Sequence, residues 1–156
     1  MALPDVRETV FERIVVALDT DSDRSDRVVE AAEQLARVTD SAVLVADIQN
    51  VERTAVIAAT PRPGAIPPPL PMDSSRQAQS LVARAVDRLQ RAGIAAEGIV
   101  RPGEGSTARD LLQIADGFDA TVIVVGDSGS RVTDLLLGGV AHKIVRDASC
   151  SVLLVR

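Results

Sequence analysis

Residues 121–155 read TVIVVGDSGSRVTDLLLGGVAHKIVRDASCSVLLV, an order of residue types that indicates a strand, a glycine-rich loop, a helix and a second strand. The two ends, 121–125 and 152–155, are short β-branched or apolar runs, which are typical of strands buried on both faces. Between them, residues 134–147 place apolar side chains at helical spacing. This order predicts a βαβ unit with parallel strands.

The same alternation of strand and helix patterns extends back to the start of the chain. Three further apolar runs predict the remaining strands, the last of them weaker than the others: Ile14–Leu18, Ala42–Ala46 and Ile94–Arg101. We therefore expect an α/β fold, in which a single open five-stranded parallel sheet carries helices on both faces.

Helical spacing of apolar residues predicts three more helices, at 25–38, 75–92 and 107–116. Their ends carry recognisable capping residues. These are Ser25 as an N-cap, Ser74 with Gln77 as a capping box, and Gly93 as a stop.

The length of 156 residues suits one domain. We expect an N-terminal tail at 1–11 and one domain at 12–156. Six of the eight prolines lie at 61–71, and proline cannot donate a ladder hydrogen bond, so we expect a surface insertion at 60–72. A PxxP peptide ligand is a second interpretation of that segment.

Composition excludes several classes of function. The chain has two Phe, no Trp and no Tyr, so its core must be aliphatic, and it lacks the rings on which nucleic-acid binders stack bases. Seventeen basic and 22 acidic residues give a net charge of −5, which provides no surface for nucleic acid or an anionic membrane. A single cysteine, Cys150, and an N-terminus without an apolar signal core predict a cytoplasmic protein.

Acidic residues crowd the loop after the first predicted strand. Asp19, Asp21 and Asp23 alternate as in a calcium loop, with Glu30 at the twelfth position, but Arg24 stands where such a loop needs glycine. The pattern also resembles the Asp-x-Asp of haloacid-dehalogenase phosphatases, which need Thr or Val in place of Asp23. The remaining interpretation is an acidic first turn favoured by the helix dipole, with Asp19 available to a ligand.

A second loop, 103–108, matches G-x-G-x-x-A between a strand and a helix, and Asp127 ends the next strand. This is the pattern of dinucleotide-binding folds, so a small NAD-dependent enzyme that uses this loop is one alternative. Only one further βα unit follows, which is too little for a full dinucleotide domain. The other interpretation is a glycine-rich turn in which Ser106 or Thr107 caps the next helix.

The third loop contains the densest group of glycines. Gly126 and Gly129 would let the backbone approach a ligand and adopt left-handed conformations. Gly138 and Gly139 fall inside or at the start of the last helix, where each glycine costs about 1 kcal/mol relative to alanine. Close approach of a phosphate to free backbone N–H groups would explain why two glycines stand here. His142 has no nucleophile or carboxylate partner that we can place, so we expect no catalytic centre.

This loop and helix, followed by the Cys-x-Val of residues 150–152 and a last apolar strand, closely resemble the universal stress proteins. Nucleotide-binding members of that family carry G-x2-G-x9-G-[ST] at this place. Residues 14–19 are similar to the family's first strand, and 100–103 to its third strand and turn, so the resemblance covers nearly the whole chain. It implies a Rossmann-like sheet in the order 3-2-1-4-5, similar to the adenine nucleotide alpha hydrolases.

The resemblance also implies a ligand, ATP with Mg²⁺, over the tips of the first and fourth strands. Asp19 would contact adenine or ribose, the backbone around Ala46 would hold the adenine edge, and the glycines would meet ribose and phosphates. By matched positions, the implied site comprises Leu18, Asp19, Thr20, Ala46, Val125, Gly126, Gly129, Ser130, Gly138, Gly139 and Val140.

Two departures from the family motif bear on this ligand. Only eight residues separate Gly129 from Gly138; with nine, the glycine is Gly139 and Val140 follows it. In either alignment the family's Ser or Thr hydroxyl is missing. A hydrogen bond to a charged phosphate contributes about 1.5–3 kcal/mol, so the loss weakens binding by roughly one to two decades without abolishing it.

The resemblance implies a partner as well. In the order 3-2-1-4-5 the strand Val152–Val155 forms an apolar edge, and such an edge needs a cover. Antiparallel pairing across a twofold axis would supply it, which predicts a homodimer. We interpret the chain as an ATP-binding, homodimeric stress-response module without a dedicated catalytic centre. A family member that binds no nucleotide and acts through protein contacts is the alternative.

Overall fold

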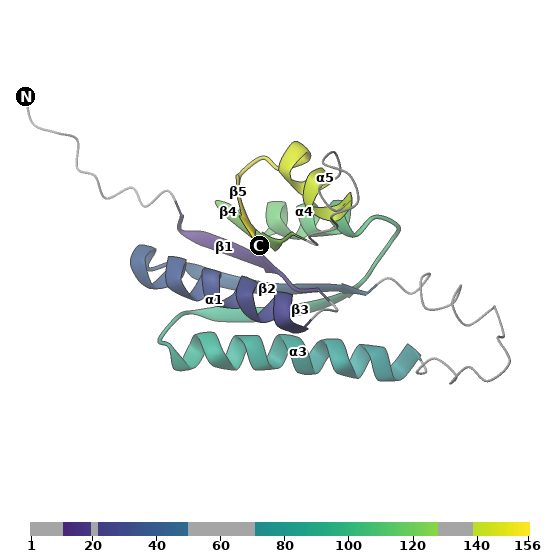
Figure 1. Cartoon of the computed structure of the whole chain (residues 1–156), viewed down its shortest axis with the longest axis horizontal. Helices are drawn as coiled ribbons and strands as arrows, with labels where there is room; N and C mark the ends of the chain where they lie inside the picture. Colours follow the sequence, from purple (N-terminus) through teal and green to yellow (C-terminus); the bar gives the residue numbers. More distant parts are fainter. Residues whose placement is uncertain (1–10, 20–21, 50–70, 128–138) are drawn as a thin grey trace, which may run out of the picture.

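A computed structural model describes residues 11–19, 22–49, 71–127 and 139–156 of the chain (Figure 1). Strands and helices alternate along it. In chain order they are β1 (Arg13–Ala17), α1 (Ser22–Thr39), β2 (Ala42–Gln49), α3 (Pro71–Arg91), β3 (Ala96–Pro102), α4 (Thr107–Gly117), β4 (Val122–Gly126), α5 (Gly139–Asp147) and β5 (Ser151–Val155).

The five strands form one sheet in the order β3-β2-β1-β4-β5, and each neighbouring pair is parallel. The central strand β1 pairs with β2 on one side and β4 on the other, so that Ile14 lies opposite both Val43 and Val122. The order of strands reverses at β1 and β4, as the family resemblance implies. The predicted α/β class and strand order are confirmed.

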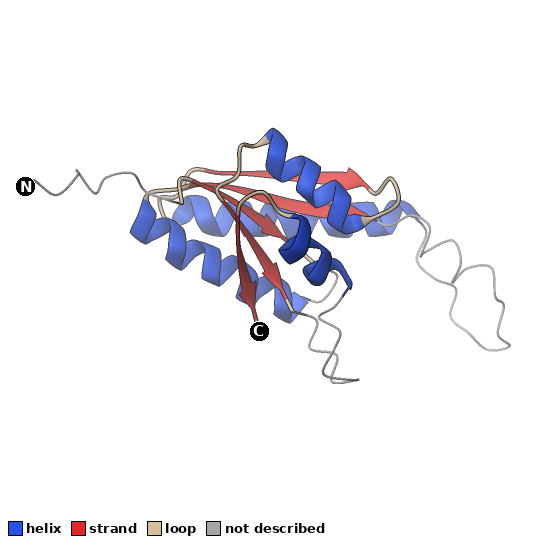
Figure 2. Cartoon of the chain, turned by 90° about the horizontal axis from the view of Figure 1, so that it is seen from above, coloured by secondary structure: helices blue, strands red, loops and turns tan. Residues whose placement is uncertain are grey.

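Helices cover both faces of the sheet: α1 and α3 lie on one face, and α4 and α5 on the other (Figures 1 and 2). Alternate strand residues supply the two cores, because successive side chains of a strand point to opposite faces. Ile14 and Val16 of β1 belong to the core under α1 and α3, whereas Val15 and Ala17 belong to the core under α4 and α5.

Aliphatic side chains fill both cores. Ile14, Leu89, Ile123 and Ile144 are among the largest fully buried residues. Phe11 and Phe118 are only partly buried and pack at the margins of the cores. The expectation of an aromatic-free core is therefore confirmed for the described residues. None of the helices in the described ranges has an apolar stretch of the length that a membrane span requires.

Two helices begin earlier than the sequence pattern predicts. Helix α1 starts at Ser22, so Ser25 is not an N-cap but a buried residue inside the helix. Helix α3 starts at Pro71, so the predicted capping box at Ser74 lies within the helix. Proline is favoured in the first helical turn because its missing N–H would have no partner there. Of the predicted tail at 1–11, residues 1–10 lie outside the described residues, and Phe11 packs against the core. Of the predicted insertion at 60–72, residues 60–70 lie outside them, and residues 71–72 belong to α3.

The predicted end of α3 is confirmed at Gly93. This residue has a φ of +80°, a conformation that glycine adopts without strain. The N–H of Gly93 donates to the carbonyl of Gln90 at 3.0 Å, and the N–H of Ile94 donates to that of Leu89 at 3.0 Å. These bonds satisfy carbonyls at the end of the helix and turn the chain toward β3.

Close packing of β3 against α3 explains the glycine in this weakly apolar strand. A Cβ added at Gly98 would lie 2.3 Å from Val82 Cγ1 and 3.0 Å from Val86 Cγ2. A side chain at position 98 would therefore push the helix away from the sheet. Glycine here permits the contact that places α3 beside α1.

Candidate functional site

The carboxyl ends of β1, β2 and β4 meet at one edge of the sheet, where ligands of open parallel sheets bind. This edge brings together five residues of the implied site: Leu18, Asp19, Ala46, Val125 and Gly126. Gly139 and Val140 begin α5, which returns from this edge because it leads into another parallel strand. Thr20, Gly129, Ser130 and Gly138 lie outside the described residues.

A buried serine fixes the backbone of Asp19 at the tip of β1. The N–H of Asp19 donates to Ser25 Oγ at 3.0 Å, and the Ser25 hydroxyl donates to the carbonyl oxygen of Asp19 at 2.8 Å. Ser25 is 4% exposed, so water does not compete for these bonds. The serine that the sequence marks as a helix cap instead holds a candidate ligand-binding residue in place.

Arg24 links the tips of β1 and β4. Its guanidinium forms an ion pair with the carboxylate of Asp19. Its aliphatic stem lies against Gly126, where an added Cβ would be 2.6 Å from both Cγ and Cδ of the arginine. In the sequence, Arg24 stands out only as an obstacle to a calcium loop. Its role depends on a contact across more than one hundred residues, and no local pattern signals that contact.

Gly126 has a packing role that the sequence does not suggest. It lies in β4, and the only described glycines with positive φ are Gly93 and Gly105, so the expectation of a left-handed Gly126 is wrong. The space over its Cα holds the stem of Arg24 and a methyl group of Val28, which would lie 3.2 Å from an added Cβ. Glycine is needed here for the approach of α1 to the strand tip.

A second carboxyl group, that of Asp47, lies close enough to Asp19 for the two charges to interact. Asp47 shares a face of β2 with Val43 and Val45, the face covered by α1 and α3. Burial raises the pKa of Asp47, and the negative charge of Asp19 raises it further. Asp47 is not among the residues that the sequence predicts for the site, because one acidic residue near a strand end is common.

The family resemblance places the adenine edge at the backbone around Ala46. In the structure the main chain of Ala46 is still paired with β1, and the next residue of β2 with the same orientation lies two positions later. Ala46 is fully buried, and its carbonyl oxygen accepts the N–H of Leu18 at 2.9 Å. The N–H of Ala42 likewise donates to Glu12 at 3.0 Å, so even-numbered residues of β2 direct their polar groups toward β1. Ile48 has the same orientation, so its N–H and carbonyl point past the end of β1. The last residue pair between the two strands is Ala17 with Ala46.

The start of α5 offers an uncharged helix N-terminus at the same edge. Gly139 and Val140 are exposed, and the first turn of α5 contains no acidic residue. Nothing described lies within 4 Å of a Cβ added at Gly139, so space is open beside its backbone. Free N–H groups and the helix dipole make such a terminus attractive to anions.

In the loop at 103–108, a side chain of the protein itself binds the backbone. The carboxylate of Asp110, which is 4% exposed in the first turn of α4, accepts the N–H of Glu104 at 3.0 Å. A pyrophosphate at this helix start would meet that buried negative charge. Ser106 is the N-cap residue of α4 but makes no side-chain capping bond. The geometry therefore gives no support to the dinucleotide interpretation.

Asp127, the acidic residue of that interpretation, is held at the tip of β4. Its N–H donates to the carbonyl of Val155 at 2.8 Å, and its carboxylate lies 3.6 Å from Nε of Arg156. Across the described ranges, no three His, Cys, Asp or Glu side chains gather as a metal site would require.

Comparison with known proteins places this geometry in a family. The sequence profile of the universal stress protein family matches residues 11–156. The chain belongs to the universal stress protein family. Universal stress protein YxiE of Bacillus subtilis is 29% identical over 94% of this chain and its own full length. Stress response protein NhaX of the same organism is 26% identical over 93% of this chain and 98% of its own length.

Solved structures agree in fold. A universal stress protein from Archaeoglobus fulgidus is 26% identical, with a TM-score of 0.72 over 94% of this chain and 99% of the other. A structure from the same organism in complex with dAMP has a TM-score of 0.67 at 24% identity, over 94% of this chain and 99% of the other. A universal stress protein in complex with cAMP has a TM-score of 0.63 at 24% identity, over 94% and 97%.

Proposed function

We propose that this chain is an adenine-nucleotide-binding universal stress protein whose ligand is ATP, held at the carboxyl edge of the sheet. The observation that carries the proposal is the division of this edge into two chemically different parts. Asp19 and Asp47 form an acidic part at the tips of β1 and β2, and the exposed start of α5 at Gly139 forms a part that attracts anions.

This division orients the nucleotide. Arg24 pairs with Asp19, but Asp47 leaves this part with a net negative charge, which disfavours phosphates. The ribose hydroxyls and the adenine amino group, in contrast, can donate to carboxylates. The base and ribose would therefore lie over β1 and β2, with the main chain of Ile48 at the adenine edge, and the phosphates would extend toward Gly139. The family members in complex with dAMP and cAMP support an adenine ligand.

The missing Ser or Thr hydroxyl of the family motif determines how strongly we expect ATP to bind. Val140 follows Gly139 and offers the phosphates its backbone N–H but no side-chain hydrogen bond. We therefore expect binding some 10- to 100-fold weaker than a site with the hydroxyl would give, from a lost bond of about 1.5–3 kcal/mol. Any Mg²⁺ would arrive with the phosphates.

The role we propose is regulatory. Hydrolysis of ATP would be slow and incidental, because His142 is an exposed residue of α5 with no place in an assembled catalytic centre. The protein would act in the cytoplasm as a homodimer. Strand β5 is the sheet edge, and Leu153 on it is 39% exposed, so antiparallel pairing with a second copy would cover an apolar strand.

Two assays test the ligand. The purified protein is denatured and its supernatant is analysed for nucleotides; the native protein is then melted with ATP, AMP, cyclic AMP, GTP and NAD. We expect ATP to raise the melting temperature, because a ligand that binds only the folded state stabilises it. No co-purified nucleotide and no shift with millimolar ATP would support the alternative, a member that acts through protein contacts alone. A shift with NAD only would support the enzyme interpretation.

A further inference from the structure

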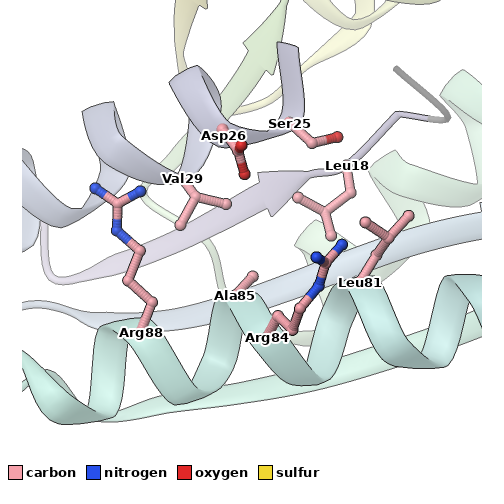
Figure 3. A pocket seen from close by; sticks show the side chains of 8 residues that line it. All are labelled: Leu18, Ser25, Asp26, Val29, Leu81, Arg84, Ala85 and Arg88. Carbon is pink, nitrogen blue, oxygen red and sulfur yellow. The ribbon is translucent and has the colours of Figure 1, made fainter. Parts of the chain in front are cut away.

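A groove runs between α1 and α3 on the face of the sheet away from α4 and α5 (Figure 3). Its volume is about 180 Å³. Leu18, at the end of β1, closes one end of it. The other lining residues come from the two helices, Ser25, Asp26 and Val29 from α1 and Leu81, Arg84, Ala85 and Arg88 from α3.

The floor of the groove is apolar. Val29 and Ala85 are buried, and the side chains of Leu18 and Leu81 are half-buried. Figure 3 shows these four side chains between the two helices, below Asp26 of α1. Ligand pockets combine such a surface with a few polar groups that fix orientation.

Two opposite charges stand on the two sides of this floor. Asp26 projects from α1 toward the groove, and the guanidinium of Arg84 rises from α3 beside Leu81 (Figure 3). Both residues are exposed, and within the described part of the chain neither has an ion-pair partner within 4.0 Å. They also do not pair with each other.

The third charge on the rim, Arg88, already has an ion-pair partner. Its Nε lies 2.7 Å from Glu33 Oε2, and the same carboxylate accepts Arg37 at 2.8 Å through its other oxygen. Among the lining residues, the two charges that lack an ion-pair partner in the described chain are therefore one carboxylate and one guanidinium. Because two arginines share Glu33, the rim as a whole keeps a small positive charge.

We propose that this groove binds a small zwitterion with a short aliphatic chain, of which an aliphatic α-amino acid is the simplest example. The guanidinium of Arg84 presents a planar fork that matches a carboxylate, and Asp26 accepts an ammonium group. The aliphatic chain lies on Leu18, Val29, Leu81 and Ala85. A simple anion would leave Asp26 without a partner, and a simple cation would leave Arg84 without one.

The volume limits how much of a ligand the groove can enclose. At 180 Å³ it lies below the ~300 Å³ at which sites for drug-sized ligands begin. The groove therefore suits a ligand smaller than a nucleotide. It shares Leu18 with the proposed nucleotide site, and Ser25, which lines it, also holds the backbone of Asp19.

The test compares three ligands with the same branched chain. L-Leucine carries both charges, 4-methylpentanoate only the carboxylate, and 3-methylbutylamine only the ammonium. Each is titrated into the full, nucleotide-free chain while amide NMR signals are followed. We expect leucine to shift the signals of Leu18, Val29 and Ala85 in a saturable manner, and each single-charge analogue to bind at least 10-fold more weakly.

Variants assign the binding to the two charges. Arg84→Gln and Asp26→Asn should each weaken leucine binding 10-fold or more. Arg109→Gln, which makes the same change at an exposed position of α4 behind the sheet, should leave it unchanged. The proposal is overturned if millimolar leucine shifts no groove signal, if the pentanoate binds as tightly as leucine, or if Arg84→Gln retains full affinity. None of these results depends on whether ATP binds.

Discussion

The side-chain stem of Arg24 lies on the backbone of Gly126, with only 2.6 Å between either of two stem carbons and the place where a Cβ would stand. The guanidinium of the same arginine pairs with Asp19. One side chain of α1 thus contacts the tips of both β1 and β4, which the sheet itself holds side by side. The residues that the family resemblance implies for the nucleotide site lie at both tips.

Replacement of Gly126 by alanine should therefore disturb both stability and the site. The new methyl group displaces the stem of Arg24 and breaks its ion pair with Asp19. We expect a loss of about 1–2 kcal/mol in the free energy of unfolding, the usual cost of overpacking, measured by denaturant titration. In an Arg24→Ala background the same replacement should cost clearly less, since the obstructing stem is gone.

Gly139→Ala is the matched control, because nothing described lies within 4 Å of its new methyl group. It should change the free energy of unfolding by less than about 0.5 kcal/mol. Equal costs for Gly126→Ala with and without Arg24 would show that the two residues do not interact.

The carboxyl group of Asp47 makes stability depend on pH. Its pKa is raised in the folded protein by burial and then by Asp19, so the folded state holds this proton more tightly than the unfolded state. Stability therefore falls as pH rises from the unfolded pKa through the folded one, and the full penalty applies above the folded pKa.

Asp47→Asn removes this penalty and should raise the melting temperature at neutral pH. The advantage should disappear at acidic pH, below the ordinary aspartate pKa of about 3.9. Asp40→Asn makes the same chemical change at an exposed turn and should show no such pH dependence of its effect. A less stable Asp47→Asn protein at neutral pH would contradict the inferred burial of this charge.

The contact of Gly98 with Val82 predicts a further pair of variants. Gly98→Ala places a methyl group 2.3 Å from Val82 Cγ1 and should destabilise the fold by about 1–3 kcal/mol. The double variant Gly98→Ala/Val82→Ala should recover part of that loss, because the smaller side chain at position 82 leaves space for the new methyl group. Gly117→Ala, at the end of α4 with open space around it, should be neutral or slightly stabilising by helix propensity. Equal effects at positions 98 and 117 would rule out the close packing of β3 on α3.

The edge strand gives a test of assembly. Leu153→Arg places a charge on the exposed face of β5 and should convert the proposed dimer to monomer or aggregate in analytical ultracentrifugation. Val38→Arg makes a comparable change on α1, where the valine is 85% exposed, and should leave the sedimentation of the protein unchanged. A Leu153→Arg protein that sediments like the parent would exclude pairing through this strand.

The sequence predicts the sheet well because each strand is a run of apolar residues that must be buried on both faces. All five strands fall within two residues of their expected starts, and the order follows from the family resemblance. The sequence predicts the starts of helices less accurately. Ser25 has a side chain that could cap a helix, but its hydroxyl donates to the carbonyl of Asp19 instead.

The site is harder to predict than the fold, because it is built from contacts between distant residues. Asp19 is expected from its place after a strand, but its partner Arg24 and its neighbour Asp47 are not. Gly126 is expected to meet a ligand, and the packing shows a second reason for glycine there, because an arginine stem lies against its Cα. Patterns along the chain show which residues lie at the strand tips, and only the packing of α1 shows which of them touch.

The most direct test of the proposed function is a calorimetric titration of the purified, nucleotide-free protein with ATP, with GTP as the control. We predict saturable binding of one ATP per chain, and at least 10-fold weaker binding after Asp19→Ala. Absence of any ATP binding at millimolar concentration, with the fold intact, would contradict the proposed function.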